Sequence, residues 1–209
     1  MIRLFQKLKS KDVSKKVGIT GGIGVGKSFC ARIFENIGIP VYDADSRAKL
    51  LMTTDPDVKN QIIEEFGHNS YDEEGNLNRK HLAEIIFSKP EKTKRINQIV
   101  HPAVGMDMIK WFNEVEAPYG LYEAALMYES GSVSFLDHVI VVDAPLSVRL
   151  ERTMKRDDIS KDEVMKRINK QMPQEEKVKK ADFVIHNDGS QSLLKQIWQI
   201  HIAIINADD

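Results

Sequence analysis

The chain has 209 residues, which is enough to bury one substantial core with insertions. Its 30 lysines and arginines nearly balance 31 aspartates and glutamates, so the net charge gives no support for binding to nucleic acid or to an anionic membrane. A single cysteine excludes internal disulfides and thiol-rich metal sites, and no apolar run approaches the length of a membrane span. These features predict a cytoplasmic protein, which we expect to be a monomer.

The N-terminal residues 1–15 are basic and contain neither a long apolar centre nor a small-residue cleavage site. Both features are needed in a secretory signal, so the sequence argues against one. We expect a frayed basic extension before the first strand.

Residues 21–28 read GGIGVGKS and match the pattern G-x-x-x-x-G-K-[ST]. The short apolar run 16–20 predicts a strand before them, and apolar residues at helical spacing predict a helix after them that ends at Gly38. Glycines let the backbone curl until successive N–H groups point at one anion, and the new helix adds the positive end of its dipole. The stretch predicts a phosphate cradle for a nucleoside triphosphate; a glycine-rich turn that binds nothing is the alternative.

Two side chains of this loop carry the chemistry. Lys27 can neutralise the outer phosphates, and the hydroxyl of Ser28 can ligate the Mg²⁺ that accompanies the nucleotide. We expect Lys27 to be catalytic. The loop residues expected to contact the nucleotide are Gly22, Ile23, Gly24, Val25, Gly26, Lys27 and Ser28.

A second short strand is predicted at 38–42, and it delivers Asp43 and Asp45 at its carboxyl end. In open parallel α/β sheets, ligands bind beyond the carboxyl ends of the strands, so both acids are expected on the side of the phosphate loop. The alternative is an ordinary strand-end turn and helix cap.

From 48 to 116 the pattern is largely helical, interrupted by a turn at 72–76 and by Pro90 and Pro102. No strand is expected there, and residues 55–116 are interpreted as an inserted helical domain. Strands return at 120–126, 138–142 and 182–185, with helical stretches between them that imply parallel crossovers.

Further signals define the second half of the chain. Pro145 opens one helix, and Ser160 with Glu163 matches a capping box for another. The basic segment 149–172 between the fourth and fifth strands is expected to form a lid, and an amphipathic helix closes the chain. The expected fold is α/β: a three-layer core of residues 16–54 and 117–209 around a five-stranded parallel sheet.

Among phosphate-loop proteins, a GTPase needs a guanine-reading N-K-x-D, but Asn169-Lys170 is followed by Gln171-Met172. The size of the chain also disfavours large transport and motor ATPases, which leaves a small-molecule kinase. Phosphoryl transfer then needs an acid near the acceptor hydroxyl, either Asp43 or Asp45, and positive charge on the transferred group. Arginines on one helical face could supply that charge or form a solvated basic face: Arg149, Arg152 and Arg156.

Separated motifs in nearly the whole chain resemble those of the dephospho-coenzyme A kinase family of P-loop kinases. They are the loop 17–28, Val41-Tyr42-Asp43-Ala44-Asp45, Leu77-Asn78-Arg79, His101-Pro102, Arg152 with Arg156-Asp157, Gln171, Ala181-Asp182 and 187–190. One departure occurs where the family has P-L-L-[FY]-E. This chain has Ala125-Leu126-Met127-Tyr128-Glu129, so alanine replaces a proline that restricts φ without contributing chemistry.

The resemblance implies ATP- and Mg²⁺-dependent phosphorylation of the ribose 3′-hydroxyl of dephospho-coenzyme A, the final step of coenzyme A biosynthesis. It favours Asp45 as the base, with Asp43 organising the Mg²⁺ water shell or the substrate, and Arg152 as a catalytic lid residue. Arg149 and Arg156 of the lid and Asn187 and Gly189 near the adenine are expected to contact ATP.

The helical insertion would receive dephospho-coenzyme A. Arg79, His101 and Glu129 are expected to contact this substrate. Each has a plain structural alternative. Arg79 could be an exposed helix-end charge, and His101 a packed residue fixed before proline. Glu129 could be an ordinary loop acid instead of a partner of the substrate or of an arginine. The competing functions are another small-molecule kinase, such as a nucleoside monophosphate kinase, and a regulatory protein that hydrolyses ATP slowly.

Overall fold

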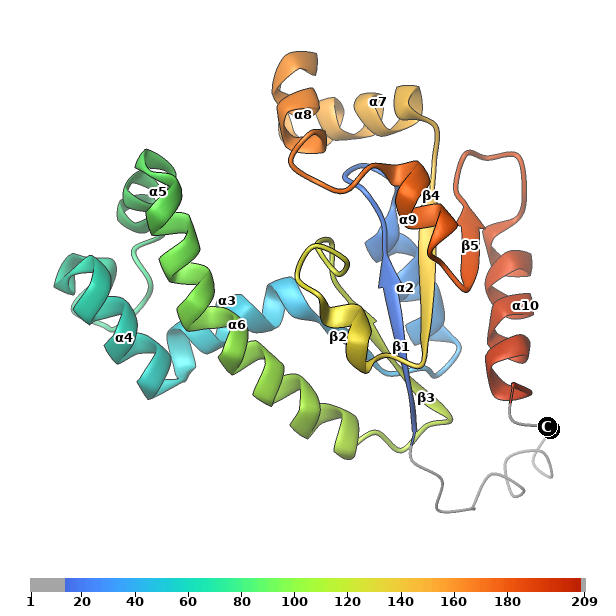
Figure 1. The fold of residues 1–209 in the computed structure, drawn as a ribbon, viewed down its shortest axis with the longest axis horizontal. Helices are drawn as coiled ribbons and strands as arrows, with labels where there is room; N and C mark the ends of the chain where they lie inside the picture. The colour runs from blue at the N-terminus through green and yellow to red at the C-terminus, as the bar shows by residue number, and fades with distance from the viewer. Residues whose placement is uncertain (1–13, 208–209) are drawn as a thin grey trace. The chain divides into compact units, whose positions relative to one another are not determined.

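The computed structural model describes residues 14–207, and its centre is a five-stranded parallel sheet (Figure 1). The strand order is β2-β3-β1-β4-β5, so β1 lies in the middle and carries the glycine loop at its carboxyl end. The predicted α/β sheet is confirmed. The strands are β1 (Lys15–Thr20), β2 (Val41–Asp43), β3 (Tyr119–Glu123), β4 (His138–Asp143) and β5 (Phe183–His186).

The helices connect these strands and form the segment between β2 and β3. They are α2 (Lys27–Asn36), α3 (Ala44–Thr54), α4 (Pro56–Phe66), α5 (Arg79–Ser88), α6 (Pro90–Asn113), α7 (Leu146–Asp157), α8 (Lys161–Ile168), α9 (Gln174–Lys179) and α10 (Leu193–Ile205). Single 3₁₀ turns are η1 (His68–Ser70) and η2 (Ser132–Phe135).

Contacts divide the described residues into two units. The core unit runs to Tyr42 and resumes at Phe112, and the insert unit is Asp43–Trp111. The core unit contains all of the sheet except Asp43, the last residue of β2.

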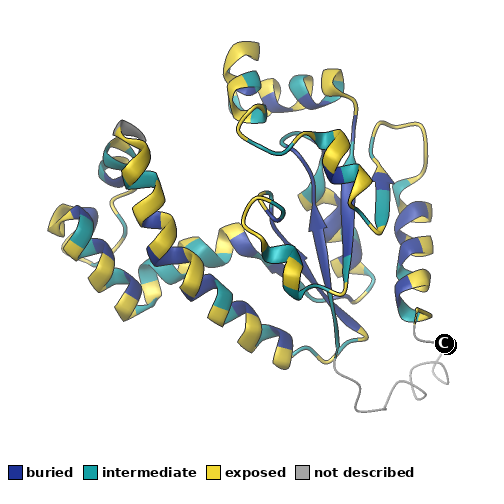
Figure 2. Cartoon of the chain, viewed as in Figure 1, coloured by how far each residue is buried: buried dark blue, intermediate teal, exposed yellow. Residues whose placement is uncertain are grey.

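In the core unit, alternation along β1 fixes the two faces of the sheet. Val17 and Ile19 are fully buried in a cluster with residues of α2 and α10, among them Phe34 and Ile197. Gly18, between them, faces the other way, where an added Cβ would lie 2.6 Å from side-chain atoms of Met127 and Leu136. Figure 2 shows the resulting pattern, with buried central strands and helices buried along one stripe.

In the insert unit, helices α3 to α5 and most of α6 bury a small core of their own that includes Ile62 and Phe66. A bidentate ion pair joins Arg47 of α3 to Asp107 of α6, with Nε to Oδ2 at 2.8 Å. The predicted turn at 72–76 is present: Gly75 N donates to Asp72 O at 3.0 Å. An isolated antiparallel bridge joins the residues that flank the turn, Tyr71 and Leu77.

Four differences from the predictions concern the second strand, the third strand, Pro102 and residue 15. The second strand begins at Val41 rather than residue 38, because Pro40 has no N–H and contributes only its carbonyl, which accepts from Leu121 N at 2.9 Å. The third strand ends at Glu123 rather than residue 126, because the carbonyl of Ala125 accepts from the side chains of Thr20 and Lys177 instead of joining the ladder.

The other two differences concern Pro102 and Lys15. Pro102 lies inside α6 and does not interrupt it. One hydrogen bond to the preceding turn is lost there, and burial of the neighbouring Val100, Ala103 and Val104 compensates. Lys15 already belongs to β1, so the predicted extension 1–15 is one residue too long, and residues 1–13 lie outside the described part.

Within residues 14–207, no helix has both the length and the apolar character needed to cross a membrane.

Candidate active site

The glycine loop between β1 and α2 takes a conformation that only glycine adopts easily. Gly24 and Gly26 have φ angles of 81° and 87°. A Cβ on Gly24 would collide with the carbonyl of Arg149, and one on Gly26 would collide with the side-chain amide of Asn187. Glycine is therefore favoured at positions 24 and 26 both by backbone conformation and by close packing.

The two chemical side chains of the loop meet at a carboxylate that the sequence analysis did not single out. Lys27 Nζ and the Ser28 hydroxyl both donate to Glu123 Oε1, at 2.5 and 2.6 Å. The Lys27 and Glu123 side chains are only 12% and 7% exposed, so this ion pair is shielded from water. An acid inside the predicted apolar strand 120–126 was the available signal for Glu123.

This cluster fits the predicted Mg²⁺. The cation prefers hard oxygen ligands and retains several waters, and the Ser28 hydroxyl and the Glu123 carboxylate are such oxygens. Among the described residues no group of three or more histidine, cysteine, aspartate or glutamate side chains could hold a metal alone. Any Mg²⁺ here would need phosphate oxygens as further ligands.

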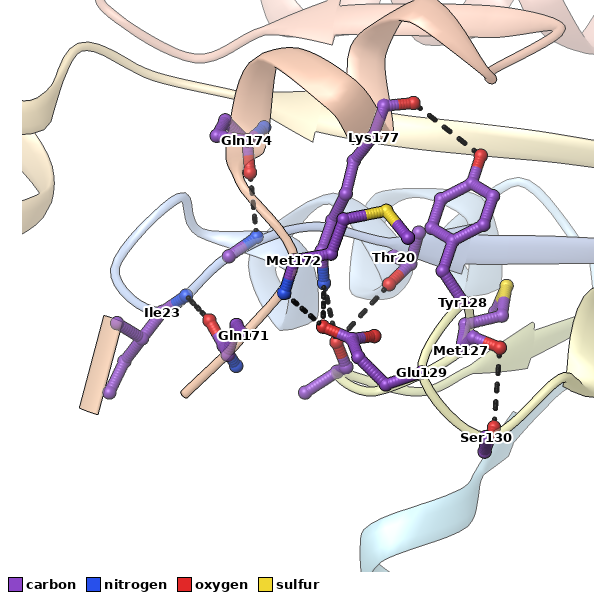
Figure 3. Close-up of polar contacts among 12 residues, drawn as sticks. Thr20, Ile23, Met127, Tyr128, Glu129, Ser130, Gln171, Met172, Gln174 and Lys177 are labelled. Carbon is purple, nitrogen blue, oxygen red and sulfur yellow. Dashed lines mark hydrogen bonds and ion pairs between the residues drawn. The ribbon is translucent and has the colours of Figure 1, made fainter. Parts of the chain in front are cut away.

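Two amides at the beginning of the loop are held by glutamines from the segment that follows α8 (Figure 3). Gly22 N donates to Gln174 Oε1 at 2.9 Å, and Ile23 N donates to Gln171 Oε1 at 3.0 Å. By contrast, the first amides of a helix have no intrahelical acceptor, which applies to Lys27 and Ser28 at the start of α2. The first half of the loop is therefore anchored at Gly22 and Ile23, and in the second half the amides of Lys27 and Ser28 are available to an anion.

The loop carbonyls are bound by the predicted arginines of α7. Arg149 Nε donates to Ile23 O at 3.0 Å, and Arg152 Nη1 approaches Val25 O at 3.4 Å. Arg149 is 5% exposed, and burial lowers the pKa of its guanidinium despite the nearby charge of Asp143. The structure thus brings Arg149 and Arg152 to the loop.

Arg156, the third predicted arginine, pairs with its neighbour Asp157, with Nε to Oδ1 at 2.7 Å. This hydrogen bond raises the pKa of Arg156 and lowers that of Asp157, which also binds Arg167 of α8. The Arg156 side chain is mostly exposed, and its contacts stay within the predicted lid.

On the other side of the loop, Asn187 Nδ2 donates to Val25 O at 2.7 Å. Gly189 follows in a turn with a φ of 86°, where Asp188 Oδ1 accepts from the hydroxyl of Ser190 at 2.6 Å. Asn187 is therefore at the phosphate loop, and Gly189 belongs to the turn beyond it.

Glu129, predicted to contact substrate, has a different environment. Its Oε1 lies 2.9 Å from Lys177 Nζ and accepts from Met172 N at 2.8 Å. Burial alone would raise the pKa of Glu129, but these hydrogen bonds and the charge of Lys177 outweigh it and lower the pKa. Lys177 was not predicted as a site residue, because it lies in a lysine-rich helix that looks exposed in the sequence.

The predicted acids Asp43 and Asp45 belong to the insert unit. Asp43 caps α3: its Oδ1 accepts from Asp45 N at 3.0 Å and its Oδ2 from the Ser46 hydroxyl at 2.6 Å. The helix cap, which was the alternative role considered for Asp43 and Asp45, is thus present at Asp43. Asp45 is exposed, and its carboxylate has no hydrogen-bond partner within residues 14–207.

Arg79 and His101 also lie in the insert unit, and both are exposed. Arg79 is the first residue of α5, after Asn78, whose side chain caps the helix. His101 lies within α6 beside Pro102. The structure therefore places the predicted donor residues in the core unit and most of the predicted acceptor residues in the insert unit.

Comparisons with known proteins agree with these motifs. A family model described as dephospho-CoA kinase matches residues 15–192. Dephospho-CoA kinase of Bacillus licheniformis is 42% identical over 177 residues, which cover 83% of this chain and 88% of the relative. That of Bacteroides fragilis is 37% identical over 187 residues, which cover 88% and 90%.

Two solved structures are also similar to this chain over nearly its whole length. A crystal structure from Thermus thermophilus matches with a TM-score of 0.79 at 34% identity, covering 92% of this chain and 98% of that one. Dephospho-CoA kinase from Campylobacter jejuni matches with a TM-score of 0.70 at 28% identity, covering 93% and 98%. The chain therefore belongs to the dephospho-CoA kinase family.

Proposed function

We infer that this chain transfers the γ-phosphoryl group of ATP to the ribose 3′-hydroxyl of dephospho-coenzyme A, giving coenzyme A and ADP. Family membership supports the reaction. The main observation in this chain is that Lys27 and Ser28 lie together at the start of α2 and share one carboxylate. The loop before them is held by Gln174 at Gly22 and by Asn187 at Val25. Positive charge and unpaired first-turn amides there suit a triphosphate.

In this proposal the second half of the loop, from Gly24 to Ser28, binds the outer phosphates of ATP. Lys27 exchanges part of its contact with Glu123 for a phosphate oxygen. Ser28 and Glu123 would hold Mg²⁺, which when bound neutralises charge on the phosphates. The shielded position of Glu123 makes each of these charge contacts stronger than it would be in water.

The lid arginines have separate proposed roles. Arg152 contacts Val25 only weakly, at 3.4 Å, so its guanidinium can turn to the transferred phosphoryl group. Arg149 is buried and holds the loop. Arg156 would have to leave Asp157 to bind ATP. We therefore favour Arg152 as the arginine that stabilises the transition state.

For the acceptor we propose Asp45 as the general base. Its carboxylate is exposed and free of hydrogen bonds to described residues, whereas both oxygens of Asp43 are engaged in the α3 cap. Arg79 and His101, exposed on the insert unit, are proposed contacts for dephospho-coenzyme A. Glu129 is assigned instead to its pair with Lys177.

The experiment is a coupled ADP-release assay with dephospho-coenzyme A, adenosine monophosphate and other nucleotides as acceptors. We expect ADP to form only with dephospho-coenzyme A, and only when Mg²⁺ is added. ADP formation with a nucleoside monophosphate would indicate the competing kinase class, and release without any acceptor would indicate a slow ATPase. We also propose that the reaction takes place in the cytoplasm, where the buried thiol of Cys30 stays reduced.

A further inference from the structure

Segment 171–177, which we call the anchor segment, makes contacts that the proposed chemistry does not use. Gln171 and Gln174 accept hydrogen bonds from two consecutive amides of the phosphate loop, those of Ile23 and Gly22 (Figure 3). The two glutamines are about 150 residues from the loop in sequence. Backbone amides of a phosphate loop are its main binding groups, so what holds them affects binding directly.

Gln174 is itself fixed in orientation. Its Nε2 donates to Val142 O at 2.9 Å and to Asp143 Oδ1 at 3.0 Å, at the carboxyl end of β4. With both amide hydrogens directed toward β4, the oxygen has to face Gly22. Gln174 thus ties the first half of the loop to the end of the neighbouring strand.

The anchor segment is also held by an ion pair between a fully buried lysine and a partly buried glutamate. Lys177 has no exposed side-chain surface, and its ammonium lies 2.9 Å from Glu129 Oε1 and 3.2 Å from Ala125 O. The same carboxylate oxygen accepts from Met172 N at the other end of the segment. Because Glu129 binds Met172 and Lys177, Gln174 between them and Gln171 directly before Met172 have little freedom to move away from the loop.

We propose that Gln171 and Gln174 are positioning residues for phosphoryl transfer, which hold the first half of the phosphate loop in its binding conformation before ATP arrives. Preorganisation of this kind increases affinity by reducing the ordering that binding requires. Gln171 is also near the end of the lid segment 149–172, so the lid and the loop share this anchor. The proposal rests on the proposed function and concerns the same site.

The alternative is that the glutamines only satisfy two buried amides. In that case their loss would lower stability and leave ATP binding unchanged. The test therefore combines three measurements on the full chain: hydrogen exchange of individual amides, the dissociation constant for ATP, and kcat and KM for both substrates. The variants are Gln171→Met and Gln174→Met, which keep side-chain length but remove the acceptor, with Gln199→Met on the exposed face of α10 as the matched control.

In Gln171→Met we expect faster exchange at the Ile23 amide, unchanged exchange in β1, and about three- to tenfold weaker ATP binding, as for the loss of one hydrogen bond. Gln174→Met should do the same at Gly22. KM for dephospho-coenzyme A and all properties of Gln199→Met should stay at the wild-type values. Gln171→Glu keeps the acceptor and should restore slow exchange at Ile23.

Unchanged hydrogen exchange at the Ile23 and Gly22 amides in the methionine variants would show that the glutamines do not hold these amides, and would overturn the proposal. Faster exchange with wild-type ATP affinity and turnover would overturn the positioning role and leave the alternative. Failure of the proposed function is separate from both, because it would appear as wild-type protein that binds ATP but forms no ADP with dephospho-coenzyme A.

Discussion

Lys27 Nζ lies 2.5 Å from Glu123 Oε1, and this carboxylate oxygen also accepts from the hydroxyl of Ser28 at 2.6 Å. The two loop side chains proposed to act on the phosphates and on Mg²⁺ are thus bound by an acid of the protein itself. A triphosphate that enters the loop has to share the Lys27 ammonium with Glu123 or displace it. Glu123 therefore opposes binding of a bare triphosphate, and it can assist only when a cation is present.

The variant Glu123→Gln tests this relationship. A neutral amide holds Lys27 less strongly than a carboxylate, so ATP in the presence of EDTA should bind about fivefold tighter. Turnover with Mg²⁺ should fall at least about tenfold, because an oxygen ligand of the right charge is lost. Calorimetric titration and steady-state assays measure the two effects, with Glu114→Gln on the exposed surface as the control. Weaker metal-free binding in Glu123→Gln would contradict the proposed competition.

The phosphate loop and the sheet could be predicted from the sequence because their signals are local. The glycines of 21–28 act through their own backbone conformation, and the φ angles of 81° and 87° at Gly24 and Gly26 are ones that glycine adopts easily. The strands are short apolar runs, which explains why their existence was predicted better than their ends. Pro40 and Ala125 moved two boundaries through contacts with distant residues.

The contacts that surround the loop could not be predicted in this way. Glu123 is 96 positions from Lys27, and Gln174 is 152 positions from Gly22. Nothing in a local pattern shows which distant side chains meet, and Lys177 looks like one more surface lysine of the run 177–180 although it is fully buried. Glu129 was assigned to substrate for the same reason, since its partner was not visible in the sequence.

The variant Asp45→Asn tests the proposed base. Replacing the carboxylate removes the proton acceptor without changing side-chain size, so single-turnover phosphoryl transfer should slow about 10²- to 10⁴-fold while ATP affinity stays within about twofold. Asp43→Asn is the informative comparison, since asparagine caps a helix as well as aspartate and should preserve α3. A single-turnover rate equal to wild type in Asp45→Asn would remove Asp45 from the base role, and a large loss in Asp43→Asn alone would transfer that role to Asp43.

The variant Arg152→Ala tests the lid arginine. Its contact with Val25 O is long, so the fold should lose little, whereas stabilisation of the transferred phosphoryl group should be lost. We expect kcat to fall about 10³-fold and ATP affinity to fall far less. Lys155→Ala, an exposed cation of the same helix, serves as the control for charge alone. Equal losses in kcat and in affinity would indicate a ground-state contact with ATP instead.

The variant Lys177→Met tests the ion pair between Lys177 and Glu129 that holds the anchor segment. Removing the ammonium leaves the partly buried Glu129 carboxylate without its cation, so the free energy of unfolding should fall by about 3 kcal/mol. The double variant Lys177→Met/Glu129→Gln removes both charges and should be more stable than Lys177→Met. Denaturant titration measures all three proteins. If the double variant were less stable than Lys177→Met, the pair would not be the source of the loss.

The pH dependence of stability follows from Glu129. Its pKa in the folded protein is below the ordinary value of 4.5, because hydrogen bonds from Lys177 and Met172 outweigh burial. Near and below pH 4.5 the unfolded chain therefore binds more protons at this position than the folded one, so the stabilisation by Glu129 is complete above that pH and is lost as pH falls through the folded pKa. The gap in unfolding free energy between wild type and Glu129→Gln should stay constant from about pH 6 to 8 and shrink steadily below about pH 4.5. Denaturant titrations at half-unit steps of pH measure it, and a gap that widened in acid would show that Glu129 is not held in its charged form by these partners.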